Sequence, residues 1–176
     1  MGDKIEYFAY GSNLSTGQMK RRGIDIFDTV KAEIPGWGLA FTIYSDKWGG
    51  GVADIIPSKS DDKVEGMIYT IDSDDLKKLD RYEGRLVTAE RETGTYRRQY
   101  IFVKVGEEWR TVLTYVVNRA VELKELFQIP PTRKYMGTLI SGAREHELSE
   151  DYIQKLIAVT KMIAVDSKEH RGIYDI

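Results

Sequence analysis

The sequence contains no cysteine, and this absence excludes disulfide bonds, thiolate zinc sites and cysteine nucleophiles. It has only two histidines, His146 and His170, which lie in separate polar stretches without the close spacing of a metal-binding pair. We expect both histidines to be solvated and neither to bind a metal. With so few histidines, a serine-based catalytic triad is not expected either.

Long apolar runs and an excess of one charge are also missing. No apolar run approaches the roughly 20 residues needed to cross a bilayer, and residues 1–6 lack the apolar core of a signal peptide. The 26 basic and 28 acidic residues give a formal net charge of -2, too small to attract nucleic acid or a membrane surface. We therefore expect a cytoplasmic protein that binds neither. Whether it is a monomer or a homodimer stays open.

The length fits one domain. The 176 residues, of which 41% are hydrophobic, are enough for a single globular domain with one sizeable core. No internal repeat, low-complexity segment or linker divides the chain. We expect residues 1–176 to form a single domain with a loose polar tail from about residue 166.

Strand patterns dominate the middle of the chain, and helical patterns dominate its end. Strands are expected at residues 5–10, 37–44, 52–56, 64–71, 95–105 and 109–117, and helices at 74–83, 133–145 and 150–162. This order predicts an α+β fold built on a curved, mostly antiparallel or mixed sheet.

The first candidate site is the loop between the first strand and a short helix. It consists of Tyr10, Gly11, Ser12, Asn13 and Leu14. The spacing of Ser15 and Gln18 is that of a capping box, which places the loop at a helix N-terminus. Unpaired amides and the helix dipole favour an anion there, such as a substrate carboxylate. The same residues also suit an ordinary strand-to-helix turn.

Glu83 is the second candidate. In the helix expected over residues 74–83, Leu76 and Leu79 mark the buried face. Glu83 follows Leu76 by seven residues and therefore points in nearly the same direction. No basic side chain of the same helix lies one turn before it, so we expect an inward carboxylate without a cation on its own helix.

The end of this helix bears on the chemistry of Glu83. Gly84 is expected to end the helix, which leaves the carboxylate at the negative end of the helix dipole. Burial and the dipole are both expected to raise its pKa, as suits a general acid and base near neutral pH. The alternative is that the helix frays and Glu83 reaches solvent or pairs with Arg81 or Arg85.

Several motifs carry a resemblance to a known family. Residues 7–14 read YFAYGSNL, residues 48–50 read WGG before a strand, residues 79–84 read LDRYEG, and residues 96–98 read YRR. Together with Tyr135 and the later Gly142-Ala143 pair, they resemble the γ-glutamylcyclotransferase family over about residues 7–156. The resemblance implies a small mixed barrel-like β-sheet with flanking helices, and it identifies Glu83 with the catalytic glutamate of the family.

The resemblance also implies a reaction. The α-amine of a γ-glutamyl group attacks its own γ-carbonyl, giving 5-oxoproline and a released amine, with Glu83 as general acid and base. The loop at residues 10–14 is expected to hold the γ-glutamyl part, and Tyr10, Tyr96, Tyr115 and Tyr135 to line the pocket. This chemistry, typical of glutathione metabolism, demands no metal or cofactor.

The substrate stays open in one respect. Residues 85–95 form a longer segment than in compact relatives, and the tail after residue 165 has no counterpart, so the amine side of the pocket is not defined. Glutathione, γ-glutamyl amino acids, γ-glutamyl amines and biosynthetic intermediates all remain candidate small-molecule substrates. A different class of answer is a non-catalytic small-molecule-binding or regulatory protein on the same fold.

Overall fold

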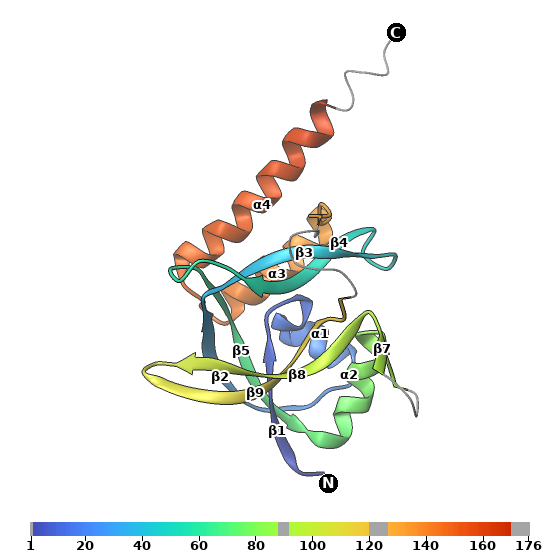
Figure 1. Cartoon of the computed structure of the whole chain (residues 1–176), viewed down its shortest axis with the longest axis vertical. Coiled ribbons are helices and arrows are strands. Elements are labelled where there is room, and N and C mark those ends of the chain that lie inside the picture. Colours follow the sequence, from blue (N-terminus) through green and yellow to red (C-terminus); the bar gives the residue numbers. More distant parts are fainter. Residues whose placement is uncertain (1, 88–91, 120–126, 170–176) are drawn as a thin grey trace.

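A computed structural model of the protein describes residues 2–87, 92–119 and 127–169. Five strands close a barrel in the order β1-β5-β2-β8-β9 (Figure 1). Their bounds are β1 (Lys4–Ala9), β2 (Ile26–Pro35), β5 (Lys63–Asp72), β8 (Tyr96–Val105) and β9 (Glu108–Val117). The neighbouring strands are antiparallel except for β1 and β9, which are parallel, so the closed sheet is mixed. This confirms the expected fold class.

Two hairpins stand outside the barrel sheet. Strands β3 (Trp37–Ser45) and β4 (Gly50–Pro57) form one antiparallel pair, and the short strands β6 (Arg85–Val87) and β7 (Glu92–Gly94) form the other. The β3–β4 hairpin packs on the side of helix α3 (Arg133–Glu145), where the rings of Phe41 and Tyr135 meet edge to face at 6.5 Å. The main chain of Gly51 also donates to the carbonyl of Pro130, at 3.0 Å.

The helices begin at capping residues that the sequence provides. After the 3-10 turn η1 (Ser12–Leu14), α1 (Thr16–Arg21) begins at Ser15, whose hydroxyl accepts from the Gln18 amide. The second half of the predicted capping box is absent, because the side-chain amide oxygen of Gln18 accepts from Arg21, and the amide of Ser15 donates to the carbonyl of Ser12 instead. Helix α3 begins in the same way, with the hydroxyl of Thr132 accepting from the amide of residue 135.

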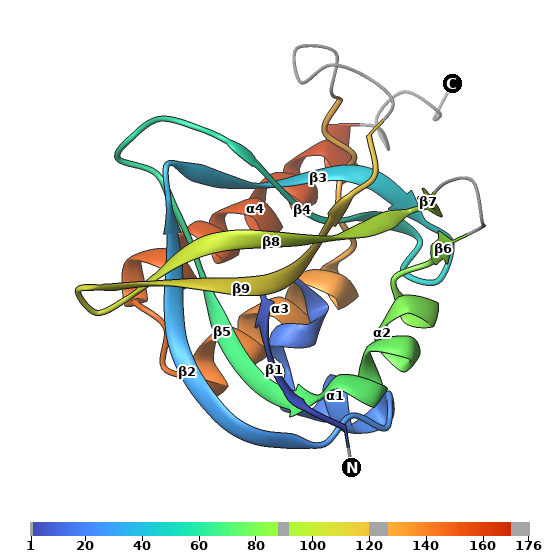
Figure 2. The same cartoon turned by 60° about the horizontal axis from the view of Figure 1, so that its bottom comes forward.

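Two further helices are α2, which follows strand β5, and α4, which follows helix α3. The 3-10 turn η2 (Ser73–Asp75) leads from β5 into α2 (Leu76–Tyr82), which lies beside α1 at one end of the barrel (Figure 2). Helix α4 (Glu150–Glu169) follows α3 and extends away from the barrel (Figure 1). Within the described ranges, no helix is both long enough and apolar enough to span a membrane.

The structure corrects several expected element boundaries. Strand β2 was not expected, because the apolar alternation is regular only in its second half and a bulge near Ile26 interrupts the first. Helix α4 was expected to end at Met162 but continues to Glu169, so the tail expected from about residue 166 starts as helix. Residues 170–176, which make up the rest of that tail, lie outside the described residues.

Candidate functional site

An open cavity of about 330 Å³ lies where the η1 loop, the β3–β4 hairpin, the end of α2, strands β8 and β9, and α3 meet. Eight of the nine residues predicted for the site line it: Tyr10, Gly11, Ser12, Asn13, Glu83, Tyr96, Tyr115 and Tyr135. The structure thus brings together segments that lie more than a hundred residues apart. A cavity of this size is within the usual range for small-molecule sites.

Leu14 is the exception, because it does not line the cavity, and its role in binding stays a prediction. Its side chain is fully buried in the hydrophobic core, away from the cavity. Its amide donates to the carbonyl of Gly11 at 2.9 Å and closes the 3-10 turn, so this amide cannot hold an anion at the same time. Its carbonyl accepts from the hydroxyl of Tyr69 at 2.7 Å, and this hydrogen bond fixes the loop to strand β5 of the barrel.

Glu83 caps the C-terminus of α2 and points into the cavity. Its amide completes the helix by donating to the carbonyl of Leu79 at 2.9 Å, and Gly84, with φ of 64°, turns the chain away. One carboxylate oxygen, Oε1, accepts from Nη1 of Arg22 at 2.5 Å and from Nδ2 of Asn13 at 3.0 Å. The side chains of Arg22 and Glu83 are only 6% and 15% exposed, so water screens the pair weakly.

Arg22 is a site residue that the sequence reasoning missed. It follows the last residue of α1 and lies 61 positions before its partner Glu83. The prediction of an inward carboxylate without a cation considered only the helix of Glu83 itself, and Arg22 lies outside that helix. Arg85, one of the two alternative partners, pairs with Asp80 at 3.0 Å instead.

Asn13 connects the glutamate to the first strand. Its side-chain amide donates both to Glu83 and to the hydroxyl oxygen of Tyr7, the latter at 2.8 Å. Tyr7 also lines the cavity, and burial followed by the negative charge of Glu83 raises its pKa far above the usual value. The sequence did not indicate Tyr7 as a site residue, because a tyrosine inside an apolar strand is typical of core packing.

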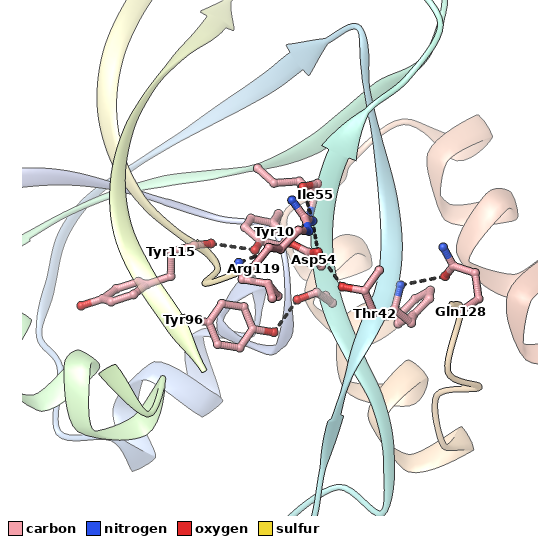
Figure 3. Close-up of polar contacts among 11 residues, drawn as sticks. Tyr10, Thr42, Asp54, Ile55, Tyr96, Tyr115, Arg119 and Gln128 are labelled. Atoms are coloured by element: carbon pink, nitrogen blue, oxygen red, sulfur yellow. Dashed lines mark hydrogen bonds and ion pairs between the residues drawn. The ribbon is translucent and has the colours of Figure 1, made fainter. Parts of the chain in front are cut away.

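Three of the cavity tyrosines use their hydroxyls to hold the backbone. Tyr10 donates to the carbonyl of Tyr115 at 2.7 Å, and Tyr96 donates to the carbonyl of Ala53 at 2.6 Å (Figure 3). Tyr135 accepts from the amide of Ala53 at 2.8 Å. Burial is the largest cause of the raised pKa of these three tyrosines and of Tyr115. Their rings therefore shape the cavity while their hydroxyls stay protonated.

Tyr115 has a different polar partner from the other three. Its hydroxyl donates to Oδ1 of Asp80 on α2 at 2.8 Å. The same carboxylate accepts two hydrogen bonds from Arg98, both at 2.9 Å, which is the bidentate geometry of a strong pair. This contact joins β8 and β9 to the helix that carries Glu83.

The lining of the cavity also includes charged and aromatic residues such as Arg22, Lys47 and Tyr82. The guanidinium of Arg22 lies 4.8 Å from the ring centre of Tyr82, and the ammonium of Lys47 lies 5.7 Å from the same ring. Trp48 belongs to the WGG motif that contributed to the family resemblance, and it also lines the cavity. The centre of its ring lies 5.0 Å from the centre of the Tyr135 ring.

The described part of the chain contains no group of three histidine, aspartate or glutamate side chains that could hold a metal ion. The expectation that His146 is simply solvated is wrong. Its Nε2 lies 2.8 Å from the hydroxyl of Tyr69, and the residue is half-buried. His170 lies outside the described residues.

Comparisons with known proteins find similarity to the AIG2-like family and to γ-glutamylcyclotransferases. The AIG2-like family matches residues 63–156. γ-Glutamylcyclotransferases from Mus musculus and Homo sapiens are 28% and 30% identical, covering 90% and 87% of this chain and 80% and 77% of their own. A solved structure of a γ-glutamyl cyclotransferase, 28% identical, superposes with a TM-score of 0.73 and covers 89% of this chain and 88% of that one.

Proposed function

Because this chain belongs to the AIG2-like, γ-glutamylcyclotransferase family, we propose that it converts a γ-glutamyl compound into 5-oxoproline and a free amine. A bond forms between the α-amine nitrogen and the γ-carbonyl carbon, and the bond from that carbon to the leaving nitrogen breaks. The proton lost by the α-amine ends on the leaving nitrogen, so no oxidant or reductant is needed. Because the reaction is intramolecular, a folded substrate gains an effective molarity on the order of 10⁵ M or more.

The observation that carries this proposal is the placement of the Glu83 carboxylate in the cavity. Both of its hydrogen bonds, from Arg22 and Asn13, reach Oε1. Within the described ranges, no protein donor reaches the other oxygen, Oε2. A carboxylate fixed on one oxygen and open on the other is suited to take a proton from the substrate amine and return it to the leaving nitrogen.

The remaining residues of the cavity would bind the substrate. We assign Gly11, Ser12 and Asn13 to the γ-glutamyl part, because their loop lies beside Glu83. The rings of Tyr10, Tyr96, Tyr115 and Tyr135 would enclose it. The proposed partner is thus a small γ-glutamyl molecule, and the chemistry needs proton transfer and positioning rather than a metal. The cytoplasmic location stays a prediction.

The test is a product analysis on a panel of glutathione, γ-glutamyl amino acids and γ-glutamyl amines. If the reaction is cyclisation, 5-oxoproline is released, it carries no label after turnover in 18O-labelled water, and acetylation of the substrate α-amine stops the reaction. Attack by water instead gives labelled free glutamate and tolerates acetylation. Turnover that survives chelation of divalent metals is also expected. Labelled glutamate as the first product would overturn the proposed mechanism.

The second candidate is a small-molecule-binding protein without catalysis. The ion pair between Glu83 and Arg22 favours it in one respect, because a paired carboxylate needs no catalytic role to be tolerated inside the protein. Calorimetric titration separates the candidates. Binding of γ-glutamyl compounds without any release of 5-oxoproline supports the binding protein, whereas turnover excludes it.

A further inference from the structure

Asp54 on β4 is a fully buried carboxylate at 0% exposure, and it lies outside the cavity lining. Its charge is balanced by Arg119, which follows β9 and also donates to the carbonyl of Ile55 at 3.3 Å (Figure 3). The Asp54 carboxylate also accepts from the hydroxyl of Thr42 on β3 at 2.6 Å. The amides of Ile55 and Val117 donate to its other oxygen at 2.8 and 3.4 Å.

This arrangement joins two parts of the fold that share no sheet. Strands β3 and β4 form their own two-stranded sheet, whereas β9 belongs to the barrel. Of the ion pairs between described residues, the one between Asp54 and Arg119 is the only one that connects the β3–β4 hairpin to the barrel side. The hydrogen bonds of Phe41 and Gly51, which also lie in the hairpin, are made with residues 128–130, the segment before α3.

The residue next to Asp54 touches the candidate site directly. Ala53 donates its amide to the hydroxyl oxygen of Tyr135 at 2.8 Å and accepts from the hydroxyl of Tyr96 at 2.6 Å. Both tyrosines and Ala53 line the cavity that contains Glu83. A shift of the Asp54 backbone would therefore move two walls of the cavity at once.

A buried ion pair is weak evidence for stability, because packed apolar residues of similar volume are often as stable. Here the pair has a geometric consequence that apolar residues could not reproduce. Its hydrogen bonds are directional, and besides the one within β4 they come from Thr42 on β3 and Val117 on β9, so they specify the position of β4 against β9 more narrowly than packing does.

We propose that Asp54 and Arg119 are positioning residues of the site: the pair sets the β3–β4 wall so that Tyr96 and Tyr135 face Glu83. This inference rests on the proposed cyclotransferase function for its kinetic consequence, though not for its structural one. Misplacement of a pocket wall by a fraction of an ångström to an ångström can lower a rate by about 10- to 100-fold.

The test compares D54N and R119M with the control E65Q. Glu65 is also a buried carboxylate in an ion pair, with Lys63 at 3.0 Å, and it lies away from the cavity. All variants are assayed well below their thermal midpoints and corrected for the folded fraction. We expect D54N and R119M to lower kcat by about 10-fold or more, R119K to restore part of it, and E65Q to lose stability only.

A second readout is independent of activity. The 13C chemical shifts of the Cζ atoms of Tyr96 and Tyr135, assigned with Y96F and Y135F, should change in D54N and R119M. They should stay unchanged in E65Q. If D54N does not fold, T42V removes one hydrogen bond from the same carboxylate and should give smaller changes of the same kind. Parent-like kinetics and unshifted resonances in the folded variants would overturn the positioning role. An inactive parent protein overturns the proposed function alone, because the resonances still report on the wall.

Discussion

Two charged side chains that meet only in the folded chain define the candidate site at the scale of single residues. Glu83 ends α2 and Arg22 follows α1, and each contributes one half of an ion pair with Nη1 and Oε1 2.5 Å apart. Helical spacing predicted the direction of Glu83 from its own helix. It could not reveal Arg22, because that contact depends on how two helices pack against each other.

The first prediction concerns E83Q, which keeps the shape of the side chain and removes its charge. Release of 5-oxoproline should fall to background, because the amide cannot take up the proton. The free energy of unfolding should fall by roughly 2–3 kcal/mol, because Arg22, 6% exposed, loses its counterion but keeps a neutral hydrogen-bond acceptor. Product assays and urea unfolding of the same preparation measure both effects.

The matched control for this prediction is E107Q. Glu107 is a carboxylate that is 95% exposed in the turn between β8 and β9, where it lies 3.2 Å from Lys104. Its removal should leave both turnover and unfolding unchanged, because exposed pairs contribute little. R22M tests the same pair from the other side and should also destabilise the protein. Turnover by E83Q at near the parent rate would show that Glu83 is not the catalyst.

At the scale of elements, the turn after α2 decides where the Glu83 carboxylate points. Gly84 adopts φ of 64°, a conformation that glycine reaches without strain, and it ends the helix directly after the glutamate. A Cβ added at Gly84 would lie 3.1 Å from the hydroxyl of Thr95, another residue of the cavity lining. The geometry of this one turn therefore links helix, strand and cavity.

The second prediction is that G84A destabilises the protein by about 1–2 kcal/mol and also lowers kcat, because relief of the strained turn moves Glu83. The control is G106A in the turn between β8 and β9. Gly106 has φ of 58° and open space around it, so its substitution carries the same backbone cost far from the cavity. G106A should reduce stability and leave kcat unchanged. An equal loss of kcat in both variants, or in neither, would contradict the role assigned to this turn.

Elements with a strong local pattern were predictable from the sequence, and elements defined by packing were not. The bounds of α3 match the expected range, because Thr132 caps its start and the apolar period runs through to Glu145. Strand β2 was missed because its bulge breaks the alternation. Leu14 was assigned to the site because it belongs to a contiguous motif, although its side chain is fully buried in the hydrophobic core.

At the scale of the whole molecule, the cavity exists because the barrel and the β3–β4 hairpin approach each other without sharing a sheet. The sequence pattern gives the strands but not the distance between the two sheets. Local pattern and the resemblance to a known family together indicated eight lining residues in advance, whereas Arg22, Tyr7 and Lys47 became visible only through tertiary contacts. Local pattern thus predicts the parts of the site, and packing determines its shape.

Burial of many tyrosines gives the whole molecule a characteristic response to alkali. The pKa is raised, with burial as the largest cause, for Tyr7, Tyr10, Tyr69, Tyr96, Tyr115, Tyr135 and Tyr152. In the unfolded chain each of these groups ionises near pH 10, while in the folded chain it keeps its proton to higher pH. The folded state therefore binds more protons than the unfolded state above about pH 10, and stability falls as the pH rises.

The last prediction is that stability is unaffected by these tyrosines below about pH 9 and is lost steeply above about pH 10. Each group contributes a loss of up to about 1.4 kcal/mol per pH unit, so several together exceed a typical stability of about 5–15 kcal/mol within one or two units. Urea unfolding against pH, followed by tyrosinate absorbance, measures this. The buried tyrosines should ionise in one cooperative step that coincides with unfolding. Y152F removes one such group away from the cavity and should make the slope shallower without changing turnover. Gradual ionisation of the buried tyrosines in a chain that stays folded would contradict the prediction, because it would mean that their hydroxyls are open to solvent.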